Sequence, residues 1–129
     1  MSLASPVCVR VLLVEDHSDT ARAMQRLLSR EGYQVSTATG VGDAMRVASE
    51  NTFDVVLSDI GLPDGDGCEL MRQLLKMYPI KGIAVTGSGF PEDVEKCKEA
   101  GFSAHMLKPV PFDKIVAMLK QITSVNEAE

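Results

Sequence analysis

The hydrophobic positions along this chain alternate between two periods, and this alternation predicts the fold. Short runs rich in β-branched residues predict five strands, at residues 7–14, 34–38, 54–58, 82–85 and 105–107. The third and fourth runs are almost continuously apolar, as expected for strands that are covered on both faces.

Between these runs, apolar residues recur at the spacing of a helix that buries one face. The stripes are Ala21, Met24, Leu27 and Leu28; Val41, Ala44, Met45 and Ala48; Leu70, Met71, Leu74 and Leu75; a weaker one with Val94 and Cys97; and Ile115, Val116, Leu119 and Ile122. Gly32 and Gly101 stand where the first and fourth helices should stop. Five strand-then-helix units predict an α/β fold, with a parallel sheet and helices on both of its faces.

The chain shows no linker, internal repeat or low-complexity segment that would divide it. Its 129 residues suit one domain, which we place at residues 7–124 between short tails at 1–6 and 125–129. With 45% hydrophobic and 24% charged residues, the composition is typical of a soluble globular protein. No apolar run is long enough to cross a bilayer, and residues 1–6 lack the features of a secretory signal.

Charge and cysteine content narrow the possible functions further. A net charge of −5 disfavours direct nucleic-acid binding, which normally requires clustered Lys and Arg. The three cysteines are far apart in sequence and form no CxxC pair, so they indicate neither a disulfide framework nor a zinc site. We interpret them as small apolar side chains, and we expect a reducing, cytoplasmic environment and no direct membrane contact.

Polar side chains follow four of the predicted strands. Glu15 and Asp16 follow the first strand, Asp59 the third, Thr86 the fourth and Lys108 the fifth. Because ligands bind beyond the carboxyl ends of the strands in an open parallel sheet, these side chains should meet at one edge. The sequence therefore predicts a site with three carboxylates, one hydroxyl and one ammonium group.

The charges at this edge predict metal-assisted phosphoryl chemistry. Three converging carboxylates repel one another, and a hard divalent cation such as Mg²⁺ relieves that repulsion. A carboxylate held beside such an ion can attack a phosphoryl group and form an aspartyl phosphate. Lys108 and the Thr86 hydroxyl would hold the remaining phosphoryl oxygens, because the transfer depends mainly on positioning and charge neutralisation.

Four motifs at these strand ends resemble the defining motifs of response-regulator receiver domains, in order and at compatible spacing. They are VLLVED at 11–16, VVLSD at 55–59 with LPDGDG at 62–67, AVTG at 84–87 and LKP at 107–109. The resemblance covers essentially the whole chain. It implies a flavodoxin-like (βα)5 three-layer sandwich, in which the five parallel strands have the order 2-1-3-4-5.

The resemblance also implies roles for individual residues. Asp59 is implied to be the phosphoacceptor, with Mg²⁺ or Mn²⁺ bound directly by Asp16, by Asp59 and by the Gly61 backbone carbonyl. Glu15 is implied to act on the ion through water. Pro63, Gly67 and Pro109 are implied to be structural residues, with a cis peptide bond between Lys108 and Pro109.

His105 is the main departure from the family pattern. Many receivers have Tyr or Phe three positions before the lysine, and that ring moves inward when the threonine (here Thr86) engages the phosphoryl group. His105 is therefore either a switch residue or a partly exposed strand residue without a switching role. Gly61, Gly87 and Ser88 border the predicted phosphoryl site, and we expect such small residues to leave it open to water and to small phosphodonors.

Asp16 and His17 also have simpler structural interpretations. Asp16 is a candidate N-cap of the helix that follows, although Ser18 or Asp19 fits that role equally well. We expect His17 to be a solvent-facing residue at the start of this helix.

The expected partner is a histidine kinase or a histidine phosphotransfer domain, which would supply the phosphoryl group from a phosphohistidine. Phosphorylation would change the surface formed by the fourth helix, fifth strand and fifth helix, where homodimerisation is also possible. The region around Gly101 to Val110 resembles receivers attached to hybrid histidine kinases. The receiver would itself take part in self-phosphorylation and autodephosphorylation.

Two alternatives compete with this interpretation. Haloacid-dehalogenase-type phosphatases also combine an Asp nucleophile, a Thr or Ser, a Lys and Mg²⁺, but they require a second Asp where this chain has Gly61. The second alternative is a phosphorylation-independent, receiver-like interaction module, and the full set of site residues argues against it.

Overall fold

The structure is a computed structural model that describes residues 8–123. The predicted tails, 1–6 and 125–129, and residues 7 and 124 at the limits of the predicted domain lie outside the described residues. The strands are β1 (Arg10–Val14), β2 (Gln34–Ala38), β3 (Val55–Asp59), β4 (Gly61–Leu62), β5 (Gly65–Asp66), β6 (Lys81–Thr86) and β7 (Ala104–Leu107). The helices are α1 (Ser18–Arg30), α2 (Val41–Glu50), α3 (Gly67–Met77), α4 (Pro91–Ala100) and α5 (Phe112–Thr123).

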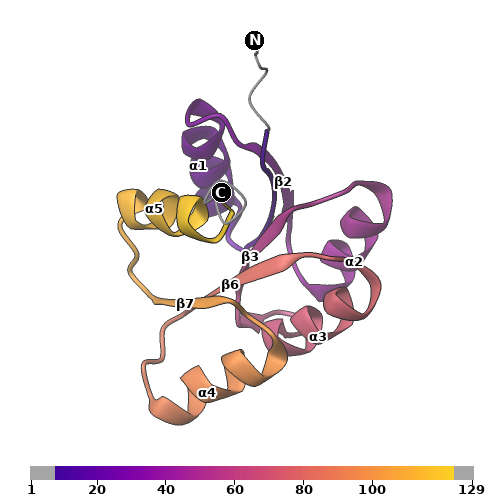
Figure 1. The fold of residues 1–129 in the computed structure, drawn as a ribbon, viewed down its shortest axis with the longest axis vertical. Helices are drawn as coiled ribbons and strands as arrows, with labels where there is room; N and C mark the ends of the chain where they lie inside the picture. The colour runs from indigo at the N-terminus through magenta and orange to yellow at the C-terminus, as the bar shows by residue number, and fades with distance from the viewer. Residues whose placement is uncertain (1–7, 124–129) are drawn as a thin grey trace, which may run out of the picture.

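Five of the strands form one parallel sheet in the order β2-β1-β3-β6-β7. Counted within this sheet alone, the order is 2-1-3-4-5, as the family resemblance implied. Helices α1 and α5 cover one face and α2, α3 and α4 cover the other (Figure 1), so the molecule has three layers. No described helix combines the length and the apolar character that a membrane span requires.

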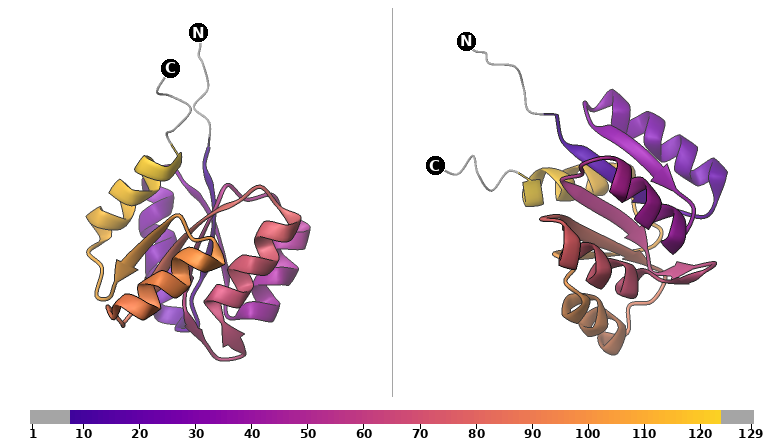
Figure 2. Two further views of the ribbon diagram at one scale, coloured as in Figure 1. Left: turned by 60° about the horizontal axis from the view of Figure 1, so that its bottom comes forward. Right: turned by 90° about the vertical axis from the view of Figure 1, so that its right-hand side faces the viewer.

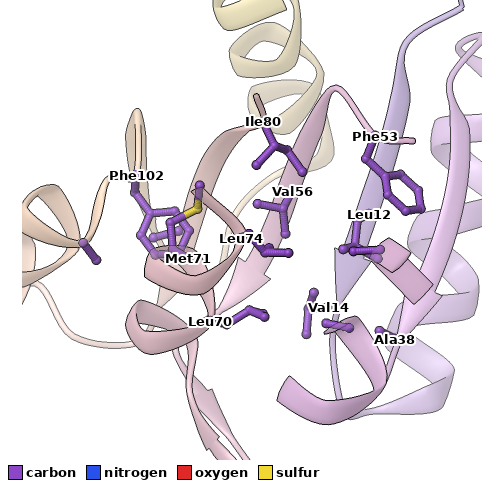
Figure 3. Close-up of a cluster of buried hydrophobic side chains, with 14 of the residues drawn as sticks. Leu12, Val14, Ala38, Phe53, Val56, Leu70, Met71, Leu74, Ile80 and Phe102 are labelled. Atoms are coloured by element: carbon purple, nitrogen blue, oxygen red, sulfur yellow. The ribbon is translucent and has the colours of Figure 1, made fainter. Parts of the chain in front are cut away.

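The alternating side chains of the strands divide the core into two clusters. In β1, Leu12 and Val14 face the cluster shared with α2, α3 and α4 (Figure 3), whereas Val11 and Leu13 face the cluster under α1 and α5. In β3, Val56 belongs to the first cluster and its neighbours belong to the second. The central strands are therefore covered on both faces, as their continuous apolar sequence predicted.

Two of the predicted helical stripes were too wide. Leu27 of α1 is 37% exposed and Leu75 of α3 is 42% exposed, although both were assigned to a buried face. Leu28 and Leu74, their immediate neighbours, are fully buried, so Leu27 and Leu75 lie at the edge of the apolar stripe rather than at its centre. The predicted helix ends are confirmed, because Gly32 and Gly101 have left-handed backbone angles with φ of 98° and 109°.

A short antiparallel hairpin, β4–β5, follows β3 and projects at the end of the sheet where the strands terminate (Figure 2). The hairpin was not predicted from the sequence. Asp64, at its turn, accepts hydrogen bonds from the backbone amides of Val41 (2.7 Å) and Gly42 (3.0 Å) in the first turn of α2. Asp66 caps α3 by accepting from the amide of Cys68 at 2.7 Å. The hairpin is thus fastened to the starts of two helices.

Gly67 was expected to be a structural residue, and its close surroundings require glycine. A Cβ atom at this position would collide with the backbone carbonyl of Asp59, so only glycine allows α3 to begin this close to the end of β3. Pro63 lies between the two hairpin strands, and the Lys108–Pro109 peptide bond is cis, as the family resemblance implied.

Candidate functional site

An ion pair between Asp59 and Lys108 lies at the centre of the site. Asp59 is the last residue of β3, one position later than the predicted strand end, and only 6% of it is exposed. The Nζ atom of Lys108 lies 3.0 Å from Oδ1 of Asp59. Lys108 directly follows β7, and its backbone amide donates to the Thr86 carbonyl at 2.8 Å, which extends the pairing of β6 and β7 to the site.

Glu15 adds a second buried carboxylate next to Asp59. It directly follows β1, and its amide donates to the Ala38 carbonyl at 2.9 Å, which holds it against the end of β2. Burial raises the pKa of Asp59 to about 6; the hydrogen bond from Lys108 opposes this shift and the nearby Glu15 charge reinforces it. Burial alone would lower the pKa of Lys108, but the hydrogen bond and charge of Asp59 outweigh it and raise that pKa. The site therefore has more negative charge than Lys108 neutralises.

The donor set at this edge fits a divalent cation. Carboxylate oxygens of Glu15 and Asp16 lie together with a ring nitrogen of His17, all within 4.8 Å of one another. Gly61 begins β4 two residues after Asp59, in the hairpin that borders the same edge. Oxygen ligands of this kind, completed by water, suit Mg²⁺ or Mn²⁺.

Thr86 lies at the end of β6, directly after Val85, the residue paired with Asp59. Its hydroxyl oxygen accepts a hydrogen bond from the backbone amide of Ser88 at 3.1 Å. The Ser88 hydroxyl in turn bonds the carboxylate of Asp93 in the first turn of α4. A chain of two hydrogen bonds thus connects Thr86 to α4.

The two glycines that were predicted to border the site leave space there. No atom lies within 4 Å of the position where a side chain would begin at Gly61 or at Gly87. Access of water and small phosphodonors to the site stays a prediction.

His105 lies in β7 opposite Ala84 of β6 and is half-buried. Its Nε2 atom is enclosed and has no hydrogen-bond partner among the described residues. A buried ring nitrogen without a partner is unfavourable. His105 is two residues before Leu107, which lies opposite Thr86.

His17 faces solvent at the start of α1, as expected, but its contacts with two carboxylates were not predicted. Its ring is 75% exposed, but Nδ1 lies 3.2 Å from a Glu15 oxygen and 3.6 Å from an Asp16 oxygen. The N-cap of α1 is His17 itself, without a side-chain capping bond, so the predicted caps Asp16, Ser18 and Asp19 were wrong. The glutamate two positions earlier, at a strand end, was the signal that could have suggested this contact.

A cavity of about 470 Å³ adjoins Asp59 on the face covered by α1 and α5. Leu57 and Asp59 point to the same face of the sheet because they are two residues apart in β3, and both line the cavity. The other polar lining residues include Glu15, His17 and Lys108, whereas Met24 and Ile115 contribute apolar walls. The sequence analysis did not predict this cavity.

The chain matches known proteins over nearly its whole length. Residues 11–120 match the family model of the response regulator receiver domain. The chain is 37% identical over 118 residues to the sensor histidine kinase RcsC of Salmonella typhimurium, an alignment that covers 89% of this chain and 12% of that protein. The chain thus corresponds to a small part of this curated relative.

Solved structures agree with this assignment. A receiver domain protein (CheY-like) from Methanospirillum hungatei has a TM-score of 0.88 and 30% identity, covering 95% of this chain and 98% of that one. The beryllofluoride-activated NtrC4 receiver domain dimer has a TM-score of 0.81 and 27% identity, covering 87% of this chain and 93% of that one. With the family match, the CheY-like topology and the acidic residues and lysine at the expected strand ends, the chain belongs to the response regulator receiver domain family.

Proposed function

We propose that this receiver domain is a phosphorylation switch in which Asp59 accepts a phosphoryl group from a phosphohistidine donor, with Mg²⁺ or Mn²⁺ required. The observation that carries the proposal is the buried Asp59 carboxylate, 3.0 Å from Lys108 and beside the buried Glu15. A nucleophilic carboxylate needs such an environment, because cations must neutralise both the attacking oxygen and the phosphoryl oxygens.

In the proposed reaction an Asp59 oxygen forms a bond to phosphorus while the bond from phosphorus to the donor histidine nitrogen breaks. The electron pair stays with the leaving imidazole, which takes up a proton. Lys108 holds a phosphoryl oxygen, and Asp16, Asp59 and the Gly61 carbonyl hold the metal ion, with Glu15 acting through water. The ion, when bound, neutralises charge on the carboxylates and on the phosphoryl group.

The proposed switch starts when Thr86 turns its hydroxyl toward the new phosphoryl oxygens. This movement breaks the bond from the Ser88 amide, and Ser88 is linked to Asp93 of α4. His105 lies opposite Ala84, two residues before Thr86 in β6, and the space around its ring would change as Thr86 moves. The surface of α4, β7 and α5 would change as a result.

The proposed partner is a histidine kinase or a histidine phosphotransfer domain. The RcsC alignment supports a role for this domain as a segment of a hybrid sensor kinase, and the NtrC4 receiver dimer supports homodimerisation upon phosphorylation. We place the reaction in the cytoplasm, where the free cysteines Cys8, Cys68 and Cys97 would stay reduced. No direct role in nucleic-acid or membrane binding is proposed.

Phosphoryl incorporation from acetyl phosphate, read as intact mass, tests the proposal. We expect one metal-dependent phosphoryl group on the wild type and none on Asp59→Asn. Asp113→Asn, an exposed aspartate in the first turn of α5, is the matched control and should label like the wild type. Labelling that persists in Asp59→Asn, or no labelling of the wild type, would favour the phosphorylation-independent interaction module instead.

A further inference from the structure

We infer that His17, Glu15 and Asp16 form a nitrogen-containing metal site that overlaps the proposed Mg²⁺ site at Asp16 and binds Zn²⁺ and Co²⁺ in preference to Mg²⁺. The inference rests on the proposed metal site but not on phosphorylation. It assigns His17 a role in choosing the ion.

The distances between the donor atoms fit a small transition-metal ion. Nδ1 of His17 lies 3.2 Å from Oε2 of Glu15 and 3.6 Å from Oδ1 of Asp16. In a tetrahedral zinc site with bonds of about 2.0 Å, neighbouring donor atoms are about 3.3 Å apart. His17 therefore lies at nearly the separation from each carboxylate that a shared ion would impose, and the two carboxylate oxygens lie within 4.8 Å of each other.

The backbone favours this arrangement as well. The amide of His17 donates to the same Glu15 oxygen at 3.1 Å, which fixes that oxygen close to the imidazole. Glu15 is 7% exposed, so one donor is rigidly held, whereas Asp16 and His17 are accessible to an incoming ion. Nδ1 hydrogen-bonds Glu15 in the absence of metal, and an ion would replace the proton between these two atoms.

The polar contacts of the His17 side chain are its hydrogen bond to Glu15 and its approach to Asp16. It is the N-cap of α1, but its side chain makes no capping bond, and three-quarters of its ring is exposed rather than packed in a core. The ring is turned to the two acidic side chains instead of away from them.

The chemistry of the donor atoms sets the ion preference. Imidazole nitrogen is a good ligand for Zn²⁺, Co²⁺ and Cu²⁺, whereas Mg²⁺ prefers carboxylate oxygen and water. An ion held by Glu15, Asp16 and His17 also occupies Asp16, which the proposed Mg²⁺ site requires. The two classes of ion should therefore exclude each other.

The test is direct measurement of metal binding to the unphosphorylated protein at one fixed pH. Co²⁺ and Zn²⁺ affinities are measured by calorimetry, and Mg²⁺ affinity by competition, for wild type, His17→Gln and His105→Gln. The sequence has two histidines, so His105→Gln is the matched control. Asp16→Asn should weaken the binding of both classes of ion, which would show that the measured site is the proposed one.

We expect His17→Gln to lower the affinity for Co²⁺ and Zn²⁺ at least about tenfold. Even the loss of a residue that only hydrogen-bonds a metal ligand lowers metal affinity by about this factor or more. Mg²⁺ affinity should stay within about twofold, and His105→Gln should resemble the wild type. In the wild type, Zn²⁺ should shift the ¹⁵N resonance of His17 Nδ1 and not those of His105, which tests the ligand without any variant.

Equal Co²⁺ and Zn²⁺ affinities for wild type and His17→Gln, or an unshifted His17 nitrogen resonance at saturating Zn²⁺, would overturn the inference. A failure of the phosphorylation proposal looks different: Asp59 would not label with acetyl phosphate, yet the His17-dependent binding of Zn²⁺ would persist.

Discussion

The two sides of the site, the acidic side around Asp59 and the threonine side around Thr86, differ in how far they are already assembled. On the acidic side, Asp59 contacts Lys108 directly, and Glu15 is buried next to it. On the other side, the Thr86 hydroxyl is engaged with the Ser88 amide and not with Asp59. The groups for the chemical step are thus in place, whereas the groups that detect its product must still change partners.

The residues of the site therefore fall into two groups with different expected roles. Substitutions on the acidic side should decide whether a phosphoryl group is acquired. Substitutions on the threonine side should decide whether the rest of the domain responds to it. Three experiments test this division, starting with the largest expected effect.

Removing Lys108 should break the acidic side. Lys108→Ala leaves Asp59 and Glu15 without their shared cation, and we expect labelling by acetyl phosphate at saturating Mg²⁺ to slow about 100-fold, as for loss of one preorganised charged donor. Initial labelling rates from intact mass measure this. Lys114→Ala, an exposed lysine on α5, should label at the wild-type rate. A Lys108→Ala rate within threefold of wild type would contradict the assignment.

Neutralising Asp59 should stabilise the metal-free fold in a pH-dependent way. The pKa of Asp59 is raised to about 6, so this carboxyl holds more protons in the folded than in the unfolded state, and folded-state stability is lost as pH rises toward 6. Asp59→Asn should therefore gain on the order of 2 kcal/mol in unfolding free energy above pH 6, with the gain shrinking toward pH 4. Urea unfolding in EDTA at several pH values measures it. A gain that grows on acidification would refute the buried-carboxylate interpretation.

Removing the Thr86 hydroxyl should separate acquisition from response. Thr86→Ala loses a neutral hydroxyl, so labelling should slow only on the order of tenfold. This effect is smaller than for Lys108→Ala, because hydrogen bonds from charged donors are roughly twice as strong as neutral ones. The phosphorylation-induced NMR shifts of α4 amides should largely disappear. Thr52→Ala is the control, because Thr52 is exposed and precedes β3, at the opposite end of that strand from Asp59. Full α4 shifts in phosphorylated Thr86→Ala would show that the signal takes another route.

The sequence was sufficient to predict that Asp59, Glu15 and Lys108 come together. Parallel strands end at one edge, so Asp59 and Lys108, far apart in the chain, had to come together. The partners of Thr86 and His17 were not predictable, because they depend on side-chain rotamers that the folded loops select. The β4–β5 hairpin escaped prediction since its strands of two residues each are too short to show a period.

The attachment of Asp64 to the first turn of α2 has a consequence for transplanting this site onto another scaffold. Helix α2 contributes no group to the site, yet its amides at Val41 and Gly42 hold the hairpin that contains Gly61. A side chain at Gly40 would collide with the Asp64 carboxylate. A designer who copied only the residues at the strand ends would lose this support, so the portable unit includes the start of α2.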